Sequence, residues 1–553
     1  YNILRIKKSG KWIYIGSKYN MKNQIDKFLG NFTENDKEKI LIVFGFGAGE
    51  HIKQLRKKFE NNKIIVIDPI ENLNKIIDEE NWIKNDKKLF IINTKTDSVI
   101  GKLSKHLGNY NFDYTKFVSF SPYDKIFVNE KKEFLVLIRN YYTGQIVSRN
   151  TQMQYYREWF KIFIHNLKYI LSGESINKCK NTYKNIPAVI VSAGPSLEKN
   201  IDELKRTEGK FIVITAARTL NILLEKGIKF HFLVVVDPHK DTYNIVKHII
   251  DKVNVPLIFY QYTNDELVKH HNGKKIYYLD DDGISNYLKI NTDRLYAGGS
   301  VAHTMTDFAA YIGCDPIIYV GQDLAYTNDK SYSKFSGNLD GSRKYDDVKR
   351  SDDILIESVG GGTVRTSIVY NLFRENMEKI ISNHHNIRFI NATEGGARIK
   401  GTIEMRLADA IEKYKYDNIE ISEYLSNVSK NHNEDIVYYE DEIYKIEKYL
   451  SYLENRCLEA LNNVERLKKA KSPGKNYIIK KVLKELDKID ESFKDSLIDM
   501  LLQPLFWYIM RESLKKNDKY MLEDIEKENS LLYGSILNEI QFAKDFVRNE
   551  YKN

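Results

Sequence analysis

The stretch from Pro187 to Asn200 constrains the fold of this 553-residue chain more than any other part of the sequence. Its first part, Ala188-Val189-Ile190-Val191, is apolar and mostly β-branched, which is typical of a strand buried on both faces of a parallel sheet. The run ends abruptly in Ser192-Ala193-Gly194-Pro195-Ser196, and apolar residues at helical spacing follow. The stretch therefore predicts a strand, a tight turn and a helix with Ser196 as its N-cap.

The turn between this strand and this helix is a candidate nucleotide site. Small residues allow a ligand to approach the backbone closely, and the free N–H groups at the start of a helix attract phosphate. The same residues also suit a tight connection that serves packing only. The turn by itself leaves both interpretations open.

Length and charge limit the classes of protein to which the chain can belong. A chain of 553 residues is too long for one hydrophobic core and should divide into roughly three or four domains. The net charge of +9 arises from 85 Lys and Arg against 76 Asp and Glu, mixed along the chain. A solvated surface accounts for this balance, so we expect no nucleic-acid partner.

Cysteine spacing and hydropathy predict a soluble cytoplasmic protein. The three cysteines, Cys179, Cys314 and Cys457, are far apart, which argues against a disulfide framework or a zinc ribbon and suits a reducing compartment. The longest apolar stretch near the C-terminus, Met500–Met510, is shorter than the ~18 to 20 residues that a membrane span needs. We therefore expect no membrane span.

Residues 1–130 predict a Rossmann-like domain. An alternating segment within residues 1–30 indicates a hairpin, and the strand Ile40–Phe44 then runs into the glycine-rich loop Gly45-Phe46-Gly47-Ala48-Gly49. A second strand, Ile64–Ile67, ends in Asp68, and this spacing resembles methyltransferases that bind an adenosyl ribose. Residues 70–130 offer no recognisable substrate site, so we favour a structural role and leave a ligand at this loop open.

The rest of the chain predicts a helical connector over residues 131–181, a doubly wound α/β domain over 182–405 and a helical bundle over 406–553. Apolar residues at three- and four-residue steps indicate the connector and the bundle. Breaks between the bundle helices are expected at Ser472-Pro473-Gly474 and near Asn517-Asp518. The strands predicted for the α/β domain are Ala188–Val191, Phe211–Thr215, Phe232–Val236, Pro256–Phe259, Lys275–Leu279, Pro316–Val320 and Ile387–Asn391.

Four loops of the α/β domain leave the carboxyl ends of strands, where open parallel sheets bind their ligands. A further turn, Ala297-Gly298-Gly299-Ser300-Val301-Ala302-His303, opens the helix before the fourth of these strands. Together these loops place Asp237, Asp323 and several N–H groups around one crevice, which favours a binding site over a plain scaffold. The four loops are Ser192–Ser196, Thr215-Ala216-Ala217-Arg218-Thr219, Val236-Asp237-Pro238-His239 and Val320-Gly321-Gln322-Asp323-Leu324-Ala325-Tyr326.

Four segments of the chain resemble the motility-associated factor (Maf) family of flagellin glycosyltransferases. They read SAGPSL at 192–197, DP at 237–238, GGSVAHTMTDFAAYIGCDPIIYVGQDLAYT at 298–327 and NATEGGARIKG at 391–401. The central domain of that family is in turn similar to the bacterial sialyltransferases of glycosyltransferase family 42. The resemblance covers most of the chain, because the family also has an N-terminal Rossmann-like domain and a C-terminal helical domain.

The resemblance implies transfer of a nonulosonic acid, of the pseudaminic or legionaminic type, from its CMP-activated form to Ser or Thr hydroxyls of flagellin. The CMP-sugar and flagellin are thus the expected partners. A CMP-sugar carries one phosphate, so we expect no metal ion and no other cofactor. Asp280-Asp281-Asp282-Gly283 is accordingly interpreted as a turn rather than a metal-binding motif. The sequence leaves the identity of the sugar and the oligomeric state open.

The resemblance also assigns roles to residues. In the sialyltransferases the first Gly-Pro-Ser turn holds the nucleotide, which here corresponds to Gly194-Pro195-Ser196, with Ala193 where those enzymes have Asn. Their Asn-Pro matches Asp237-Pro238, their cytosine-binding Ser-Gly turn matches Gly299-Ser300, and their Gly-x-Asp strand end matches Gly321-Gln322-Asp323. The expected donor-binding residues are Ser192, Ala193, Gly194, Pro195, Ser196, Ala217, Arg218, Asp237, Gly299, Ser300, Gly321, Gln322 and Tyr326.

The chain departs from the sialyltransferases at the general base. Their catalytic His lies in a segment that corresponds to about Gly360–Thr366, where this chain has Gly360-Gly361-Gly362-Thr363. Another side chain must therefore take the proton of the acceptor hydroxyl. The candidates are Asp323, Asp237, Glu394 and His303, with His239 as a further base or phosphate partner and Arg218, Arg365 and Lys400 as anion ligands.

Two other functions remain open at this point. The central domain also resembles the archaeal pterin pyrophosphokinases, which would need ATP and Mg²⁺, although that resemblance does not explain the long flanking domains. Because the sialyltransferase His is missing, the chain could instead be a non-catalytic flagellin-binding partner.

Overall fold

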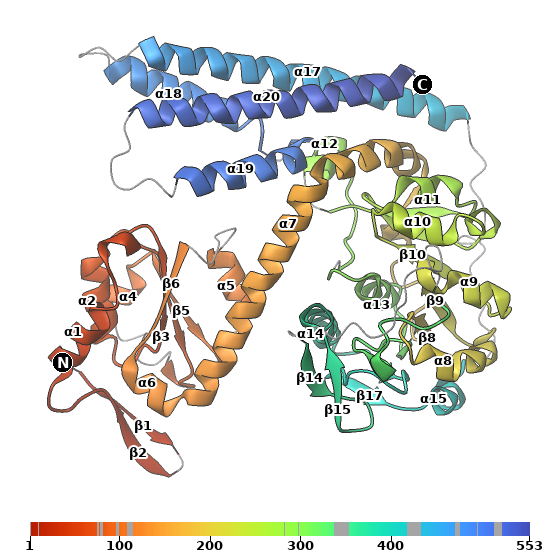
Figure 1. Cartoon of the computed structure of the whole chain (residues 1–553), viewed down its shortest axis with the longest axis horizontal. Helices are drawn as coiled ribbons and strands as arrows, with labels where there is room; N and C mark the ends of the chain where they lie inside the picture. The colour runs from red at the N-terminus through yellow and green to blue at the C-terminus, as the bar shows by residue number, and fades with distance from the viewer. Residues whose placement is uncertain are drawn as a thin grey trace. The chain divides into compact units, whose positions relative to one another are not determined.

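The computed structural model describes the chain except for residues 1, 9, 74–76, 78–80, 96–98, 108–113, 281–282, 297, 337–352, 417–432, 470–475, 495, 514–521 and 553. Asp281, Asp282, Ala297 and the two expected helix breaks therefore lie outside the described residues. The chain divides into two compact units, Tyr1–Gln152 and Met153–Asn553. The helix α7, Val128–Ser172, contributes to both units, which are described separately (Figure 1).

The first unit is an α/β domain built on a parallel sheet with the strand order β5-β4-β3-β6. Every residue of β3 and β4 is buried, as the apolar runs Ile40–Phe44 and Ile64–Ile67 require in a sheet covered on both faces, and Asp68 at the end of β4 is buried as well. An antiparallel hairpin precedes this sheet, which confirms the hairpin predicted for residues 1–30. The strands are β1 (Leu4–Lys8), β2 (Lys11–Ile15), β3 (Ile40–Phe44), β4 (Ile64–Asp68), β5 (Leu89–Asn93) and β6 (Thr115–Ser119). The helices are α1 (Met21–Leu29), α2 (Glu50–Lys58), α4 (Asn81–Lys84), α5 (Val99–Leu107), α6 (Ser121–Ile126) and the first part of α7.

The second unit contains a larger parallel sheet with the strand order β17-β16-β13-β8-β9-β10-β11-β12-β7. Each strand predicted for this domain is present within two residues of its expected bounds, whereas β7, β17 and the antiparallel hairpin β14-β15 were not predicted. The parallel strands are β7 (Glu174–Ser175), β8 (Ala188–Val191), β9 (Ile212–Ala216), β10 (Phe232–Val235), β11 (Leu257–Tyr260), β12 (Lys275–Tyr278), β13 (Ile317–Val320), β16 (Phe389–Asn391) and β17 (Thr402–Glu404). The hairpin strands are β14 (Ile354–Glu357) and β15 (Thr363–Thr366).

The faces of this sheet are covered by different helices because successive side chains of a strand point to opposite faces. On β10, Phe232 and Val234 pack in the cluster that contains α13 (Val301–Tyr311), while Leu233 and Val235 pack in the cluster that contains α7 and the C-terminal helices. The remaining helices between strands are α8 (Leu197–Asn200), α9 (Ala217–Glu225), α10 (Lys240–Val246), α11 (Asp265–His270), α12 (Gly283–Leu288), α14 (Ile368–Asn383) and α15 (Leu407–Tyr414).

The chain ends in the predicted helical region. Two long helices, α17 and α20, pack against each other, and Figure 1 shows them side by side with α18 and α19. No helix in the described part of the chain is long and apolar enough to cross a membrane. The four helices are α17 (Asn433–Lys469), α18 (Asn476–Asp490), α19 (Asp499–Ser513) and α20 (Leu522–Lys552).

Candidate functional site

The order of the strands in the large sheet places a switch point at β8. The chain adds β9, β10, β11 and β12 on one side of β8 and then returns to add β13 on its other side. Open parallel sheets bind ligands in the crevice outside the carboxyl ends of the strands at such a point. The two loops that border it here are Ser192–Ser196, which follows β8, and Gly321–Tyr326, which follows β13.

These two loops are joined by direct hydrogen bonds. The Ser192 hydroxyl donates to Oε1 of Gln322 at 2.6 Å, and the Gly194 N–H donates to the Gly321 carbonyl at 2.8 Å. Both glycines are required by this close approach. A Cβ on Gly194 would lie 2.1 Å from Oδ1 of Asp323, and a Cβ on Gly321 would lie 2.1 Å from the Ser192 carbonyl oxygen.

The buried carboxylate of Asp323 is hydrogen-bonded to the first loop. It accepts a hydrogen bond from the Ser196 hydroxyl at 2.5 Å and one from the Ser196 N–H at 3.1 Å, and the residue is 3% exposed. Burial raises the pKa of Asp323, although the bonds from Ser196 oppose this shift. The first candidate for the general base is thus bound within the fold, where it positions the turn.

The helix expected after this turn differs from the prediction. Only Leu197–Asn200 is α-helical, and a 3-10 helix continues through Ile201–Thr207. The Ser196 hydroxyl donates to Asp323 instead of capping the helix, and the Ser196 N–H is bonded to the same carboxylate. The start of the helix therefore already has an anionic partner, and the expected attraction of a phosphate to its free N–H groups does not apply.

Arg218 supplies positive charge beside the switch point. It lies in the first turn of α9, immediately after β9, the strand adjacent to β8, while Ala217 before it is buried. Its guanidinium lies 4.7 Å from the ring centroid of Tyr332, and within the described residues it has no ion pair with a carboxylate. By contrast, Arg365 is paired with Asp329 and Asp353, so its charge is already neutralised.

Two tyrosines, Tyr332 and Tyr370, lie near this arginine. Tyr332 belongs to a segment that crosses the first loop, because the N–H of the next residue, Ser333, donates to the Ala193 carbonyl at 2.9 Å. Tyr326, at the end of the second loop, packs against Tyr370 of α14 with ring centroids 5.5 Å apart. Burial raises the pKa of Tyr370, so its phenol stays protonated and able to donate a hydrogen bond. Tyr332 and Tyr370 were not predicted as site residues, because no sequence motif marks them.

The turn before α13 also reaches this edge of the sheet, but its histidine points inward. Ser300 caps α13 by accepting from the Ala302 N–H, and Gly299 has a positive φ of 87° beside the Phe373 ring. His303 is fully buried and its Nε2 donates to the Phe373 carbonyl at 2.8 Å. Burial lowers the pKa of His303 to about 4, so this imidazole is neutral and structurally bound.

Asp237 and His239 follow β10, the strand next to β9. Oδ1 of Asp237 accepts a hydrogen bond from the His239 N–H at 2.9 Å, which shapes the turn into α10. Asp237 is half-buried, whereas His239 is exposed and meets the ring of Tyr155 edge-on, with centroids 4.7 Å apart. Tyr155 lies on α7, so the predicted connector reaches this loop. The helical spacing of apolar residues in the connector predicted only a packing role for it.

Glu394 and Lys400 are engaged elsewhere. Oε1 of Glu394 lies 3.3 Å from Nδ2 of Asn200 and 3.3 Å from the N–H of Leu407, so the carboxylate ties α8 to the start of α15. Lys400 is exposed and its N–H is bonded to Glu378 of α14. The sequence Gly360-Gly361-Gly362, found in place of the sialyltransferase His, forms the tip of the hairpin β14-β15, and all three glycines have positive φ.

The glycine-rich loop of the first unit is filled by the protein itself. Asp68 accepts hydrogen bonds from the Phe46 N–H at 2.7 Å and from the Tyr123 hydroxyl at 2.5 Å. That hydroxyl in turn accepts from the Gly47 N–H at 2.8 Å, and the Tyr123 ring lies where a Cβ on Gly45 would be. Burial raises the pKa of Asp68 to about 6. The favoured structural role of this loop agrees with these contacts.

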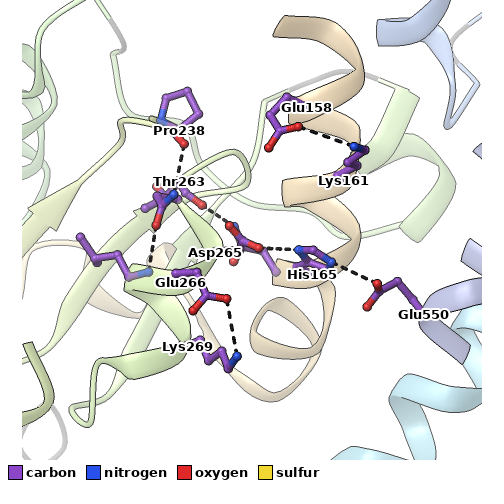
Figure 2. A network of polar contacts seen from close by, with 12 residues as sticks. Glu158, Lys161, His165, Pro238, Thr263, Asp265, Glu266, Lys269 and Glu550 are labelled. Atoms are coloured by element: carbon purple, nitrogen blue, oxygen red, sulfur yellow. Dashed lines mark hydrogen bonds and ion pairs between the residues drawn. The ribbon is translucent and has the colours of Figure 1, made fainter. Parts of the chain in front are cut away.

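A polar network connects the Asp237 loop to the C-terminal helix (Figure 2). Asn264 donates from its backbone to the Asp237 carbonyl at 3.0 Å and from its side chain to the Pro238 carbonyl at 3.3 Å. The next residue, Asp265, is bonded to His165 of α7, whose Nε2 lies 3.4 Å from Glu550 of α20. These two carboxylates raise the pKa of His165, chiefly through the hydrogen bond to Asp265. Within the described residues no group of three His, Cys, Asp or Glu side chains could hold a metal ion.

Comparisons with known proteins agree with the fold described above. Residues 161–329 match a family model described as 6-hydroxymethylpterin diphosphokinase MptE-like. Among solved structures, the chain is similar to the MAf glycosyltransferase from Magnetospirillum magneticum AMB-1, with 14% sequence identity and a TM-score of 0.52, over 97% of this chain and 85% of the other. At this identity the likeness concerns the fold, and it confirms the predicted α/β architecture with its C-terminal helices. No curated protein matches the sequence. The similarity to glycosyltransferase family 42 stays a prediction.

Proposed function

We propose that this protein is a cytoplasmic glycosyltransferase that moves a nonulosonic acid from a CMP-activated donor to Ser or Thr of flagellin. The observation that carries the proposal is the switch point, where Arg218, a cation without a carboxylate partner among the described residues, stands beside two loops held in a close, glycine-dependent contact. A fold similar to that of a MAf glycosyltransferase over nearly the whole chain supports the same class of activity. The donor and the acceptor are inferred from the sequence resemblance.

The proposed chemistry needs an anion site and a proton acceptor. When the sugar–phosphate bond breaks, the leaving CMP gains negative charge, and a fixed guanidinium can stabilise that charge by paired hydrogen bonds. The position of Arg218 in the first turn of α9, after the strand next to β8, supports this role. Tyr332, whose ring packs against Arg218, and Tyr326 of the second loop are proposed as further contacts of the donor. A side chain that accepts the proton of the attacking hydroxyl completes the reaction.

A second candidate function rests on the family model. The matched segment, residues 161–329, contains both loops of the switch point, and the model is described as 6-hydroxymethylpterin diphosphokinase MptE-like. A pterin pyrophosphokinase would bind ATP with Mg²⁺ at this crevice. A third candidate is a flagellin-binding partner that transfers nothing. The two enzymes differ in the nucleotide that they bind, and the third candidate needs no nucleotide.

Thermal melting of the full chain separates the three candidates, because a ligand that binds only the folded state raises the melting temperature. We expect CMP and a CMP-nonulosonic acid to stabilise the protein in the presence of EDTA, and the Arg218→Gln variant to lose that effect. Stabilisation by ATP with Mg²⁺ but not by CMP would favour the pyrophosphokinase. Stabilisation by purified flagellin alone would favour the non-catalytic partner. Release of CMP that depends on flagellin is the corresponding activity assay.

A further inference from the structure

Three of the four residues named first as general bases have their polar atoms engaged inside the fold. Asp323 is 3% exposed and accepts two bonds from Ser196. His303 is fully buried, and Glu394 is bonded to Asn200 and to the start of α15. None of these groups can meet an acceptor hydroxyl without breaking contacts that shape the crevice. The fourth candidate, Asp237, is half-buried, and its Oδ1 accepts the His239 N–H in the turn after β10, so His239 is the exposed group of that turn.

His239 meets the geometric requirements that these residues fail. It follows β10, which lies two strands from β8, so its backbone is ~10 Å from the first loop at a strand spacing of ~4.8 Å. Its side chain is exposed, and neither ring nitrogen has a hydrogen-bond partner among the described residues. Arg218, in the first turn of α9 directly after β9, lies between the two positions in the strand order. The anion that Arg218 binds and the imidazole of His239 would thus lie at the carboxyl ends of adjacent strands, β9 and β10.

Two contacts fix the position of this imidazole. Oδ1 of Asp237 accepts the His239 N–H, which sets the backbone of the turn, and the Tyr155 ring packs edge-on against the imidazole at 4.7 Å. This turn is anchored, because Asn264 is bonded to the carbonyls of Asp237 and Pro238. The residue is therefore exposed, while its backbone is fixed by Asp237 and its ring is packed against Tyr155.

We propose that His239 is the general base of the transfer, with Tyr155 and Asp237 as positioning residues; this inference rests on the proposed function. A ring nitrogen of His239 accepts the proton of the acceptor hydroxyl as that oxygen forms its bond to the anomeric carbon of the sugar. The bond between that carbon and the phosphate oxygen breaks, and its electron pair leaves with CMP. The proton ends on the imidazole, which returns it to water.

The test compares His239→Gln and His239→Ala with the wild type and with His248→Gln, a variant of an exposed histidine in the segment that follows α10. Flagellin-dependent release of CMP is measured with CMP-legionaminic and CMP-pseudaminic acid. Loss of a general base typically costs ~10²- to ~10⁴-fold in rate, so we expect at least a ~100-fold fall in both His239 variants, with the CMP-induced rise in melting temperature unchanged. Added imidazole should restore part of the activity of His239→Ala. His248→Gln should transfer at the wild-type rate.

The positioning role of Tyr155 has its own readout. Tyr155→Phe keeps the ring against the imidazole and should retain most of the rate, whereas Tyr155→Ala should lose at least ~10-fold without a change in CMP binding. Normal transfer by His239→Gln, or failure of imidazole to restore His239→Ala, would overturn the assignment while leaving the proposed function in place. A wild type that releases CMP from neither donor would overturn both.

Discussion

The Ser196→Ala variant tests whether the Asp323 carboxylate holds the first loop of the crevice. The substitution removes the hydroxyl that donates to Asp323 at 2.5 Å and leaves the bond from the Ser196 N–H at 3.1 Å in place. Both residues are at most 3% exposed, so water cannot readily replace the lost donor. A hydrogen bond to a charged group contributes ~1.5 to 3 kcal/mol. The loop should therefore open more easily by this amount, which corresponds to a ~10- to ~140-fold larger open population.

The pH dependence of this loss follows from the raised pKa of Asp323. The ordinary pKa of an Asp carboxyl is 3.8, and the pKa of Asp323 is higher in the folded state. The stability that this shift contributes is fully present below pH 3.8 and is lost as the pH rises through the folded-state pKa. Ser196 lowers the pKa of Asp323, so its removal raises the pKa further. The loss of stability in the variant should therefore grow as the pH rises and shrink as the pH falls.

Hydrogen exchange measured by mass spectrometry on peptides that cover residues 188–200 reports this opening directly, after correction for intrinsic rates at each pH. Ser382→Ala is the matched control, since its hydroxyl donates to the Lys379 carbonyl at 2.8 Å on an exposed surface. Its local exchange should change by less than ~2-fold. Equal exchange in the two variants, or a larger loss at pH 4 than at pH 7, would refute the holding role of Asp323.

Three further predictions concern the same unit. Arg218→Gln should weaken binding of a CMP-donor by at least ~10-fold in calorimetric titration, while Arg365→Gln, which breaks an ion pair instead, should lower thermal stability. Gly194→Ala should abolish CMP-induced stabilisation in a melting assay, because its Cβ would lie 2.1 Å from Asp323. The pKa of His165 is raised in the folded state, so its contribution is present below its ordinary value of 6.5 and is lost as the pH rises through the folded-state pKa. Melting curves should accordingly show a deficit of His165→Gln that is largest below pH 6.5 and shrinks as the pH rises above it.

The strands were predictable from local sequence, whereas several connections were not. Runs such as Ala188–Val191 are apolar and β-branched, and the structure starts and ends that strand at these residues. The helix after Ser196 was predicted to continue past Asn200, but the φ of Asn200 is −131°, and its side chain donates to the Ala392 carbonyl. That partner is 192 positions away in the chain, so no local pattern could indicate the end of the helix.

The site shows the same division. The glycines and small residues of both loops were recognisable as an approach to a ligand, and Arg218 and Asp237 were named because they follow buried strands. Their roles depend on partners that the sequence does not reveal. Asp323 looked like a free carboxylate until its bond to Ser196, 127 residues away, was known. The sequence provided no reason to prefer His239 to His303 as a general base, whereas the structure shows that His303 is buried and His239 is exposed.

The sequence by itself determined the alternation of strands and helices, the tight glycine-containing turns and the edge of the sheet where polar residues gather, because each depends on the properties of neighbouring residues. Only the tertiary structure decided which polar groups are already satisfied and which remain available. A carboxylate, guanidinium or imidazole has the same intrinsic chemistry anywhere in a chain, and its role depends on the partners and the solvent access that folding brings to it.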